Sequence, residues 1–117
     1  MTDSFDQALE LSEAEMHLYA RQILLDGWDI EAQERLKLAN VLIVGCGGIG
    51  CTTAELLARA GVGKITLIDS DTVEISNLQR QIAFTSQDIG FYKAEVLAKR
   101  LKQINTYIEI ESHVAQL

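Results

Sequence analysis

The sequence predicts an α/β fold: a Rossmann-like partial parallel sheet of about three strands, preceded by an N-terminal helical segment. Residues 41–44 are entirely apolar and rich in β-branched side chains, a glycine-rich turn follows at once, and a second apolar run ends at Asp69 after a helix-like stretch. Such alternation is typical of a parallel sheet, whose strands need crossover helices between them. We expect two parts, a helical segment over residues 1–39 and a truncated Rossmann-like half-domain over residues 40–117.

Residues 12–39 carry helix patterns. Ser12 and Glu15 form a capping box, in which each side chain accepts from the other residue's backbone, so a helix should begin there and end at Gly27. Its apolar stripe would consist of Met16, Tyr19, Ile23 and Leu24. Asp29 can cap a second helix over residues 30–39, with Leu36 on its buried side.

The second part alternates between strand and helix patterns. Residues 41–44 resemble a strand covered on both faces, and residues 49–60 a helix that Gly61 ends. A strand over residues 64–69 completes a βαβ unit. Residues 70–89 are polar and irregular, which is typical of the ligand-binding edge of an open α/β sheet. A helix over residues 90–104 and a strand over residues 107–114 follow, with Ile108 and Ile110 inward.

Charge is unevenly distributed along the 117 residues. The net charge of −7 comes entirely from residues 1–36, which hold nine acids and two bases. This gives no basic field for sequence-independent nucleic-acid binding. The longest apolar run is far shorter than the ~20 residues that span a bilayer, and the acidic N-terminus differs from a secretory signal. We therefore expect no nucleic-acid or membrane partner and a cytoplasmic location.

The turn Gly45-Cys46-Gly47-Gly48-Ile49-Gly50 satisfies the pattern G-x-G-x-x-G between a strand and a helix. Glycine permits the tight turn, the approach of backbone to phosphate, and close packing of helix on strand. The helix N-terminus offers free N–H groups to an anion. Asp69 ends the next strand, where a carboxylate can accept hydrogen bonds from ribose hydroxyls. The pattern indicates a nucleotide without identifying it.

The spacing of Cys46 and Cys51 fits neither a disulfide scaffold nor the CxxC pairs of zinc sites, so we expect two reduced, buried thiols. Beyond Asp69, the amide of Asn77 and the cations Arg80 and Lys93 favour a triphosphate over a nicotinamide ring. An NAD(P)-binding Rossmann domain remains an alternative, as does a non-catalytic module that dimerises through the acidic helical segment.

Four stretches resemble the N-terminal half of the MoeB/ThiF adenylyltransferases, relatives of the ubiquitin-activating enzymes: residues 19–22, 41–50, 60–63 and 69–81. The family adenylates the C-terminal glycine carboxylate of a ubiquitin-fold sulfur carrier. Leu78-Gln79 favours its molybdopterin and thiazole branch over its tRNA-modifying branch. The resemblance implies an ATP-dependent enzyme that forms an acyl-adenylate and pyrophosphate, with the sulfur carrier as partner.

The resemblance also implies roles for individual residues. The ATP-binding residues would be Gly45, Gly47, Gly48, Asp69, Asn77, Arg80 and Lys93. The glycines would line the phosphate side, Asp69 would hold the ribose, and the others would contact the triphosphate. Arg21 matches an arginine that the family inserts into the neighbouring subunit's site, which implies a homodimer. Arg21, Arg80 and Lys93 are the candidate catalytic residues, because cations offset the repulsion as a carboxylate approaches the α-phosphate.

Some features leave alternatives open. Residues 90–93 lack the proline that relatives commonly have before Lys93, and two aromatics precede it instead. Arg80 and Lys93 could be solvated surface cations, and Arg21 could pair with an acid of its own segment, such as Glu13 or Asp26. The family's Mg²⁺-binding aspartate, its carrier groove and its usual Zn²⁺-binding CxxC pairs would come after Leu117. We therefore expect an N-terminal fragment of a longer enzyme, inactive by itself.

Overall fold

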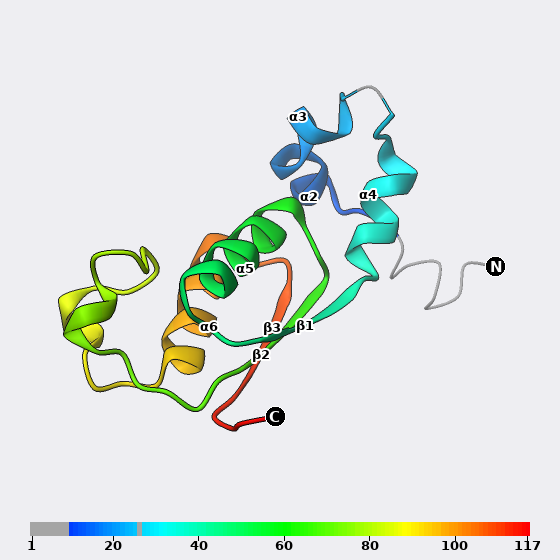
Figure 1. Cartoon of the computed structure of the whole chain (residues 1–117). Helices are drawn as coiled ribbons and strands as arrows, with labels where there is room; N and C mark the ends of the chain where they lie inside the picture. The colour runs from blue at the N-terminus through cyan, green and yellow to red at the C-terminus, as the bar shows by residue number, and fades with distance from the viewer. Residues whose placement is uncertain (1–9, 26) are drawn as a thin grey trace.

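Three parallel strands form one sheet in the order β1-β2-β3 in the computed structural model, which describes residues 10–25 and 27–117 (Figure 1). The strands are β1 (Asn40–Val44), β2 (Lys64–Ile68) and β3 (Glu109–His113). Both pairs are parallel, and the register places Ile65 between Val41 and Ile110. The predicted α/β fold with a Rossmann-like parallel sheet is confirmed.

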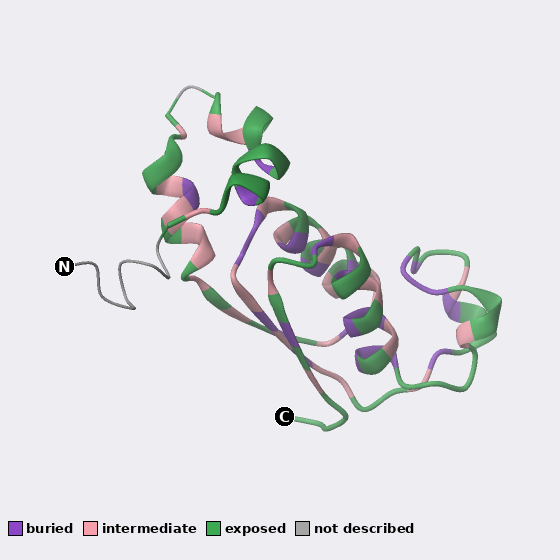
Figure 2. Ribbon diagram, turned by 180° about the vertical axis from the view of Figure 1, so that it is seen from behind, coloured by how far each residue is buried: buried purple, intermediate pink, exposed green. Residues whose placement is uncertain are grey.

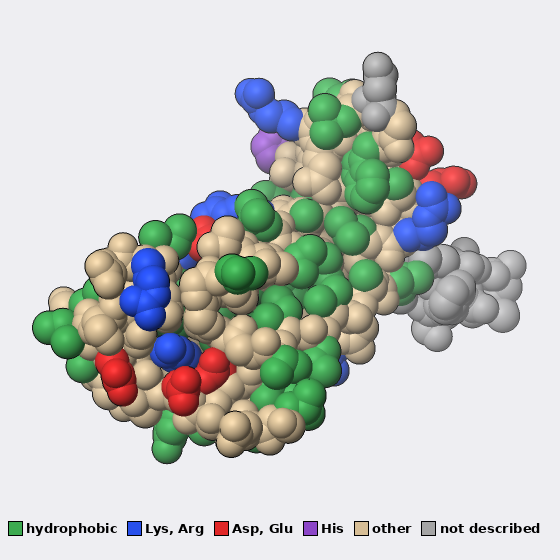
Figure 3. All heavy atoms as spheres, viewed as in Figure 1, with side chains coloured by type: hydrophobic (Ala, Val, Ile, Leu, Met, Phe, Trp, Pro, Cys, Tyr) green, Lys and Arg blue, Asp and Glu red, His purple; other side chains and the backbone are tan. Residues whose placement is uncertain are grey.

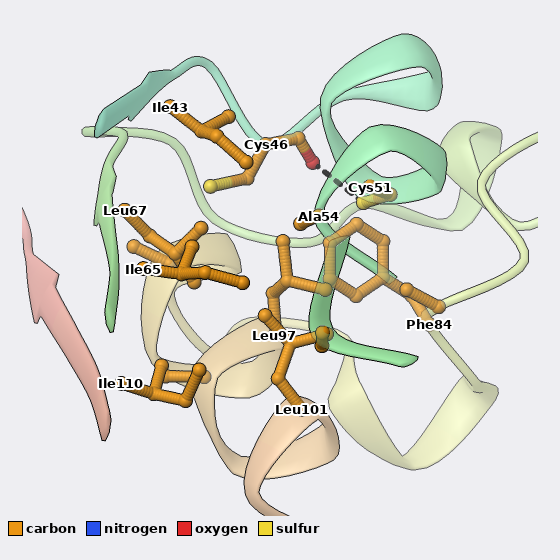
Figure 4. Packing of buried hydrophobic residues seen from close by; sticks show 14 of the residues in the cluster. Ile43, Cys46, Cys51, Ala54, Ile65, Leu67, Phe84, Leu97, Leu101 and Ile110 are labelled. Carbon is orange, nitrogen blue, oxygen red and sulfur yellow. Dashed lines mark hydrogen bonds between the residues drawn. The ribbon is translucent and has the colours of Figure 1, made fainter. Parts of the chain in front are cut away.

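The core lies between this sheet and two helices, α5 (Gly48–Ala60) and α6 (Lys93–Ile104). Buried residues lie on the helix surfaces that face the strands (Figure 2). Ile65 and Leu67 of β2 point toward Leu97 and Leu101 of α6 (Figure 4). Ile110 of β3 is buried and inward, as predicted. Among the described residues, no helix is long and apolar enough to cross a membrane.

The opposite face of the sheet is open in the described part of the chain, so the expectation of a β1 covered on both faces is wrong. Leu42 and Val44 are 54% and 55% exposed. The strands follow one another in sequence order, so both right-handed crossovers place their helices on the same face. An all-apolar strand therefore predicts burial on both faces only where a helix also covers the second face.

Three helices precede the sheet: α2 (Glu13–Leu18), α3 (Ala20–Ile23) and α4 (Ile30–Lys37). The predicted capping box is present, with Ser12 Oγ accepting from Glu15 N at 3.1 Å, and Asp29 caps α4 through Ala32 N. The single helix expected from Ser12 to Gly27 is instead interrupted at Tyr19, the one buried residue of its predicted stripe. The Tyr19 hydroxyl accepts from Asn105 Nδ2 at 2.8 Å, so the interruption coincides with a buried contact to the end of α6.

A buried amide network attaches these helices to the C-terminal end of α5. Gln33 is fully buried, and its Nε2 donates to the Ala60 carbonyl at 2.8 Å. Its Oε1 accepts from Gln22 Nε2 at 2.6 Å and from Trp28 Nε1 at 2.9 Å. Gly61 ends α5 with φ +102°, and a Cβ there would lie 2.6 Å from Gln33 Nε2. The helices α2–α4 are thus held at the end of α5 opposite the glycine loop; that they form a separate unit stays a prediction.

Candidate nucleotide site

The glycine loop closes tightly between β1 and α5. Gly45 has φ +95°, which glycine adopts readily, and its N–H donates to the Ile68 carbonyl at 2.8 Å. A Cβ on Gly50 would lie 1.9 Å from the Gly45 carbonyl oxygen, so this position admits only glycine. Gly47 is the N-cap of α5 and provides no side-chain cap, and Gly48 begins the helix. The first-turn N–H groups of α5 are therefore free of a side-chain acceptor and suited to an anion.

Asp69 joins the end of β2 to the glycine loop. Its Oδ2 accepts from Cys46 N and its Oδ1 from Asp71 N, both at 2.7 Å. A carboxylate oxygen can accept more than one hydrogen bond, so a ligand hydroxyl could still be bound. Asp69 and Gly45 line a cavity of about 330 Å³ beside the ends of β1 and β2. The arrangement is compatible with the ribose contact of Asp69, which stays a prediction.

Lys93 is positioned by an antiparallel pairing between residues 71–73 and 90–93. Val73 N donates to the Phe91 carbonyl at 2.8 Å, and Lys93 N donates to the Asp71 carbonyl at 3.0 Å. The predicted start of the helix at residue 90 is wrong, because Gly90 has φ +90° and this pairing delays α6 until Lys93. Lys93 is only 7% exposed, whereas the preceding Phe91 is 63% exposed.

A second cavity, of about 390 Å³, brings Lys93 and Asn77 together. Its walls are Ser70, Asp71, Thr72, Glu74, Asn77 and Lys93. Asn77 is buried, and its Oδ1 accepts from Glu74 N at 2.8 Å, so its Nδ2 group remains for a ligand. Acidic and basic side chains lie close together on this end of the molecule (Figure 3). Within residues 10–25 and 27–117, no group of three or more His, Cys, Asp or Glu could hold a metal ion.

The structure does not bring the two arginines into this cavity. Arg80 is exposed, and its Nη1 donates to the Ser76 carbonyl at 3.0 Å. Arg21 is exposed on α3, beyond the far end of α5 (Figure 1), and the 13 residues of α5 span about 20 Å. In the described ranges Arg21 forms no ion pair, with Glu13 or any other acid. Its other expected partner, Asp26, lies outside the described residues.

Both cysteines are buried free thiols, as predicted. Cys51 Sγ donates to the Cys46 carbonyl at 3.0 Å (Figure 4). Burial, and next the negative charge of Asp69, raise the pKa of Cys46 to about 12. Burial also raises the pKa of Cys51 to about 11, although the ammonium of Lys93 opposes it. Neither thiol is an accessible nucleophile.

The sequence predictions missed five residues of this region. Ser70, Asp71, Thr72 and Glu74 line the Lys93 cavity, and Gln81 is buried with 4% exposure. The four-residue spacing between Asn77 and Gln81 could have indicated that both amides share one side of a helical turn, since Gln81 N donates to the Asn77 carbonyl at 2.9 Å. The four cavity-lining residues between Ser70 and Glu74 show no comparable pattern in the sequence.

Comparison with known proteins finds a family model and curated relatives that match most of the chain. A family model described as the ThiF family matches residues 19–117. The molybdopterin-synthase adenylyltransferase of Salmonella typhimurium is 50% identical over 108 residues, which are 92% of this chain and 43% of that protein. The sulfur carrier protein adenylyltransferase of Thermus thermophilus is 42% identical over 103 residues, 88% of this chain and 38% of that protein.

A solved structure shares the fold and the sequence pattern. The tRNA N6-threonylcarbamoyladenosine dehydratase TcdA of Escherichia coli, in complex with ATP, superposes with a TM-score of 0.85 and 36% identity. The match covers 92% of this chain and 44% of TcdA. The chain thus spans less than half the length of these relatives.

Proposed function

The chain belongs to the ThiF family, and on that premise we propose that it is the ATP-binding part of an adenylyltransferase that acts on a ubiquitin-fold sulfur carrier. An oxygen of the carrier's C-terminal glycine carboxylate would bond to the α-phosphorus of ATP. The bond from that phosphorus to the oxygen bridging the β-phosphate would break, and pyrophosphate would leave. The products are an acyl-adenylate and pyrophosphate, and no protein nucleophile takes part.

The observation that carries this proposal is the environment of Lys93. Lys93 is only 7% exposed, lines a polar cavity, and has no carboxylate within 4 Å among the described residues. An ammonium that lines a cavity without a direct ion pair is available to a ligand that brings negative charge into contact with it, although Asp71 and Glu74 also line that cavity. A triphosphate reaching from the glycine loop would supply that charge.

Other residues fit the parts of ATP. The carboxylate of Asp69, in the adjoining cavity, would accept from the ribose hydroxyls, and Asn77 Nδ2 would donate to a phosphate oxygen. Arg80 would have to leave the Ser76 carbonyl to reach a phosphate. Arg21 would serve the site of a neighbouring subunit, because it lies too far from the cavity of its own chain; this makes the homodimer part of the proposal. Mg²⁺, when bound, would neutralise phosphate charge.

Calorimetry on the 117-residue chain tests the nucleotide. We expect ATP to bind, and Lys93→Ala to weaken binding at least about tenfold, because a hydrogen bond to a charged group is lost. Lys99→Ala is the matched control, since Lys99 is an exposed lysine on the same helix. Binding of NADH without ATP would replace this proposal with the NAD(P)-binding alternative.

Pyrophosphate exchange tests the reaction. The chain would be joined to the remaining residues of the Salmonella typhimurium relative and assayed for ATP–pyrophosphate exchange with a carrier protein ending in Gly-Gly. We expect exchange that depends on the carrier, nearly abolished by Arg80→Ala, and no exchange by the 117-residue chain alone. Full exchange by the Arg80→Ala protein would contradict the role of Arg80, and exchange without carrier would contradict the proposed substrate.

A further inference from the structure

Gln81 is a buried polar side chain whose hydrogen bonds are incomplete. It is 4% exposed, and its Oε1 is fully buried without a hydrogen-bond partner among the described residues. Its backbone is fixed on both sides: its N–H donates to the Asn77 carbonyl at 2.9 Å, and its carbonyl accepts from Phe84 N at 3.1 Å. Phe84 packs beside Cys51 and Ala54 of α5 (Figure 4), so this turn is held against the first turns of that helix.

The other end of the amide faces the glycine loop. Among the described residues, and apart from the adjoining backbone, Gln81 Nε2 is the one atom within 4 Å of a Cβ built on Gly47, at 3.9 Å. Gly47 is the N-cap of α5, a helix of 13 residues with no side chain capping its first turn. The N-terminal N–H groups of α5 and the Gln81 amide therefore lie side by side, at a place where the helix dipole favours negative charge.

A role in folding alone does not account for this amide. A buried acceptor without a partner destabilises the folded chain, and a methionine of similar size would fill the same space without that penalty. Buried polar groups that remain unpaired in a native protein call for an explanation. A phosphate only accepts hydrogen bonds, so it would leave Oε1 unpaired, but it can accept from Nε2 at the other end of the amide, which faces the N-terminus of α5.

From these observations we propose that the Gln81 carboxamide contacts a phosphate group bound at the N-terminus of α5, as a neutral donor beside the backbone N–H groups. The inference rests on the proposed ATP site and adds a residue to it. Unlike Lys93, Gln81 carries no charge, so it orients a phosphate oxygen without changing the net charge of the site. Gln81 should therefore increase the affinity for the phosphates of ATP and leave the affinity for the nucleoside unchanged.

The test compares Gln81→Met and Gln81→Glu with Gln87→Met, an exposed glutamine in the same polar segment. ATP affinity is measured by calorimetry, adenosine affinity by ligand-observed NMR, and the melting temperature by circular dichroism. For Gln81→Met we expect about a tenfold loss of ATP affinity, unchanged adenosine affinity, and an unchanged or higher melting temperature. Gln81→Glu should lose more ATP affinity, because its carboxylate repels phosphate, and Gln87→Met should match the original chain.

Each other outcome has a definite meaning. Equal ATP affinity of Gln81→Met and the original chain would overturn the inference and leave the ATP site standing. A parallel loss of ATP and adenosine affinity, or a Gln81→Met chain that unfolds, would show that the amide supports the fold, which also overturns it. Failure of the original chain to bind ATP would reject the proposed function itself.

Discussion

Replacing Gly50 with alanine should lower the stability of the fold, whereas the same change at Gly48 should not. Both glycines lie in the first turn of α5. A Cβ on Gly50 would lie 1.9 Å from the carbonyl oxygen of Gly45, while a Cβ on Gly48 would meet no atom of the described residues within 4 Å beyond its adjoining backbone. Carbon and oxygen atoms ordinarily approach to about 3.3 Å. The Gly50→Ala chain must therefore open the loop by about 1.4 Å. The atom that the new Cβ meets is a backbone carbonyl oxygen, which cannot move away by a side-chain rotation.

The size of the effect follows from this clash. Overpacking that side chains can relieve costs about 1–3 kcal/mol; a backbone clash should reach the upper end, about 3 kcal/mol of a total stability of about 5–15 kcal/mol. For a chain of this size, 1 kcal/mol corresponds to about 4 °C, so the melting temperature should fall by about 12 °C. Gly48→Ala should leave it unchanged or raise it slightly, because alanine favours a helix by up to about 1 kcal/mol over glycine.

Thermal unfolding followed by circular dichroism measures both variants. The reasoning fails if Gly50→Ala melts within about 4 °C of the original chain, or if Gly48→Ala is destabilised to the same extent. The second result would mean that the loop needs glycine for its flexibility, and that the close approach of Gly50 to Gly45 is not the cause.

Two further predictions concern ionisable groups. Because burial raises the pKa of Cys46 to about 12 and that of Cys51 to about 11, a thiol reagent at pH 8 should modify neither in the folded chain and both after denaturation; equal rates would contradict this. Burial opposes the charge of Glu15, but hydrogen bonds from Ser12 and Lys37 outweigh it and lower its pKa. The charged Glu15 carboxylate therefore stabilises the folded chain at neutral pH, and this stabilisation is lost as the pH falls below ~4.5. Glu15→Gln should make the melting temperature less dependent on pH in this acid range.

The elements that the sequence predicted best are those with local causes. Ser12, Asp29 and Gly61 act through neighbours within a few residues, so their patterns identify the ends of helices directly. The helix interruption at Tyr19 coincides with a hydrogen bond from Asn105, 86 residues away. The late start of α6 likewise depends on pairing with residues 71–73. Neither partner can be identified from residue types or spacing, because the local sequence does not indicate which distant backbone or side-chain group will form the contact.

In the candidate site, too, some features could be predicted from the sequence and others could not. Asn77 and Lys93 meet because both belong to the connection that leaves the C-terminal end of β2 and enters α6, and a ligand site at this edge of the sheet is what the βαβ pattern predicts. The pattern cannot predict where a long exposed side chain such as that of Arg80 points, since several rotamers have similar energy.

The charge of the Lys93 cavity explains why the rest of the site is needed. Asp71 and Glu74 supply two negative charges and Lys93 one positive charge, so its walls carry an excess of one negative charge. A triphosphate would be repelled by that excess unless neutral donors and further cations compensated for it. The first-turn N–H groups of α5 and the Gln81 amide can orient the phosphates at no cost in charge. The missing positive charge must then come from a reoriented Arg80, from Arg21 of a neighbouring subunit, or from Mg²⁺, and ATP affinity should depend on whichever supplies it.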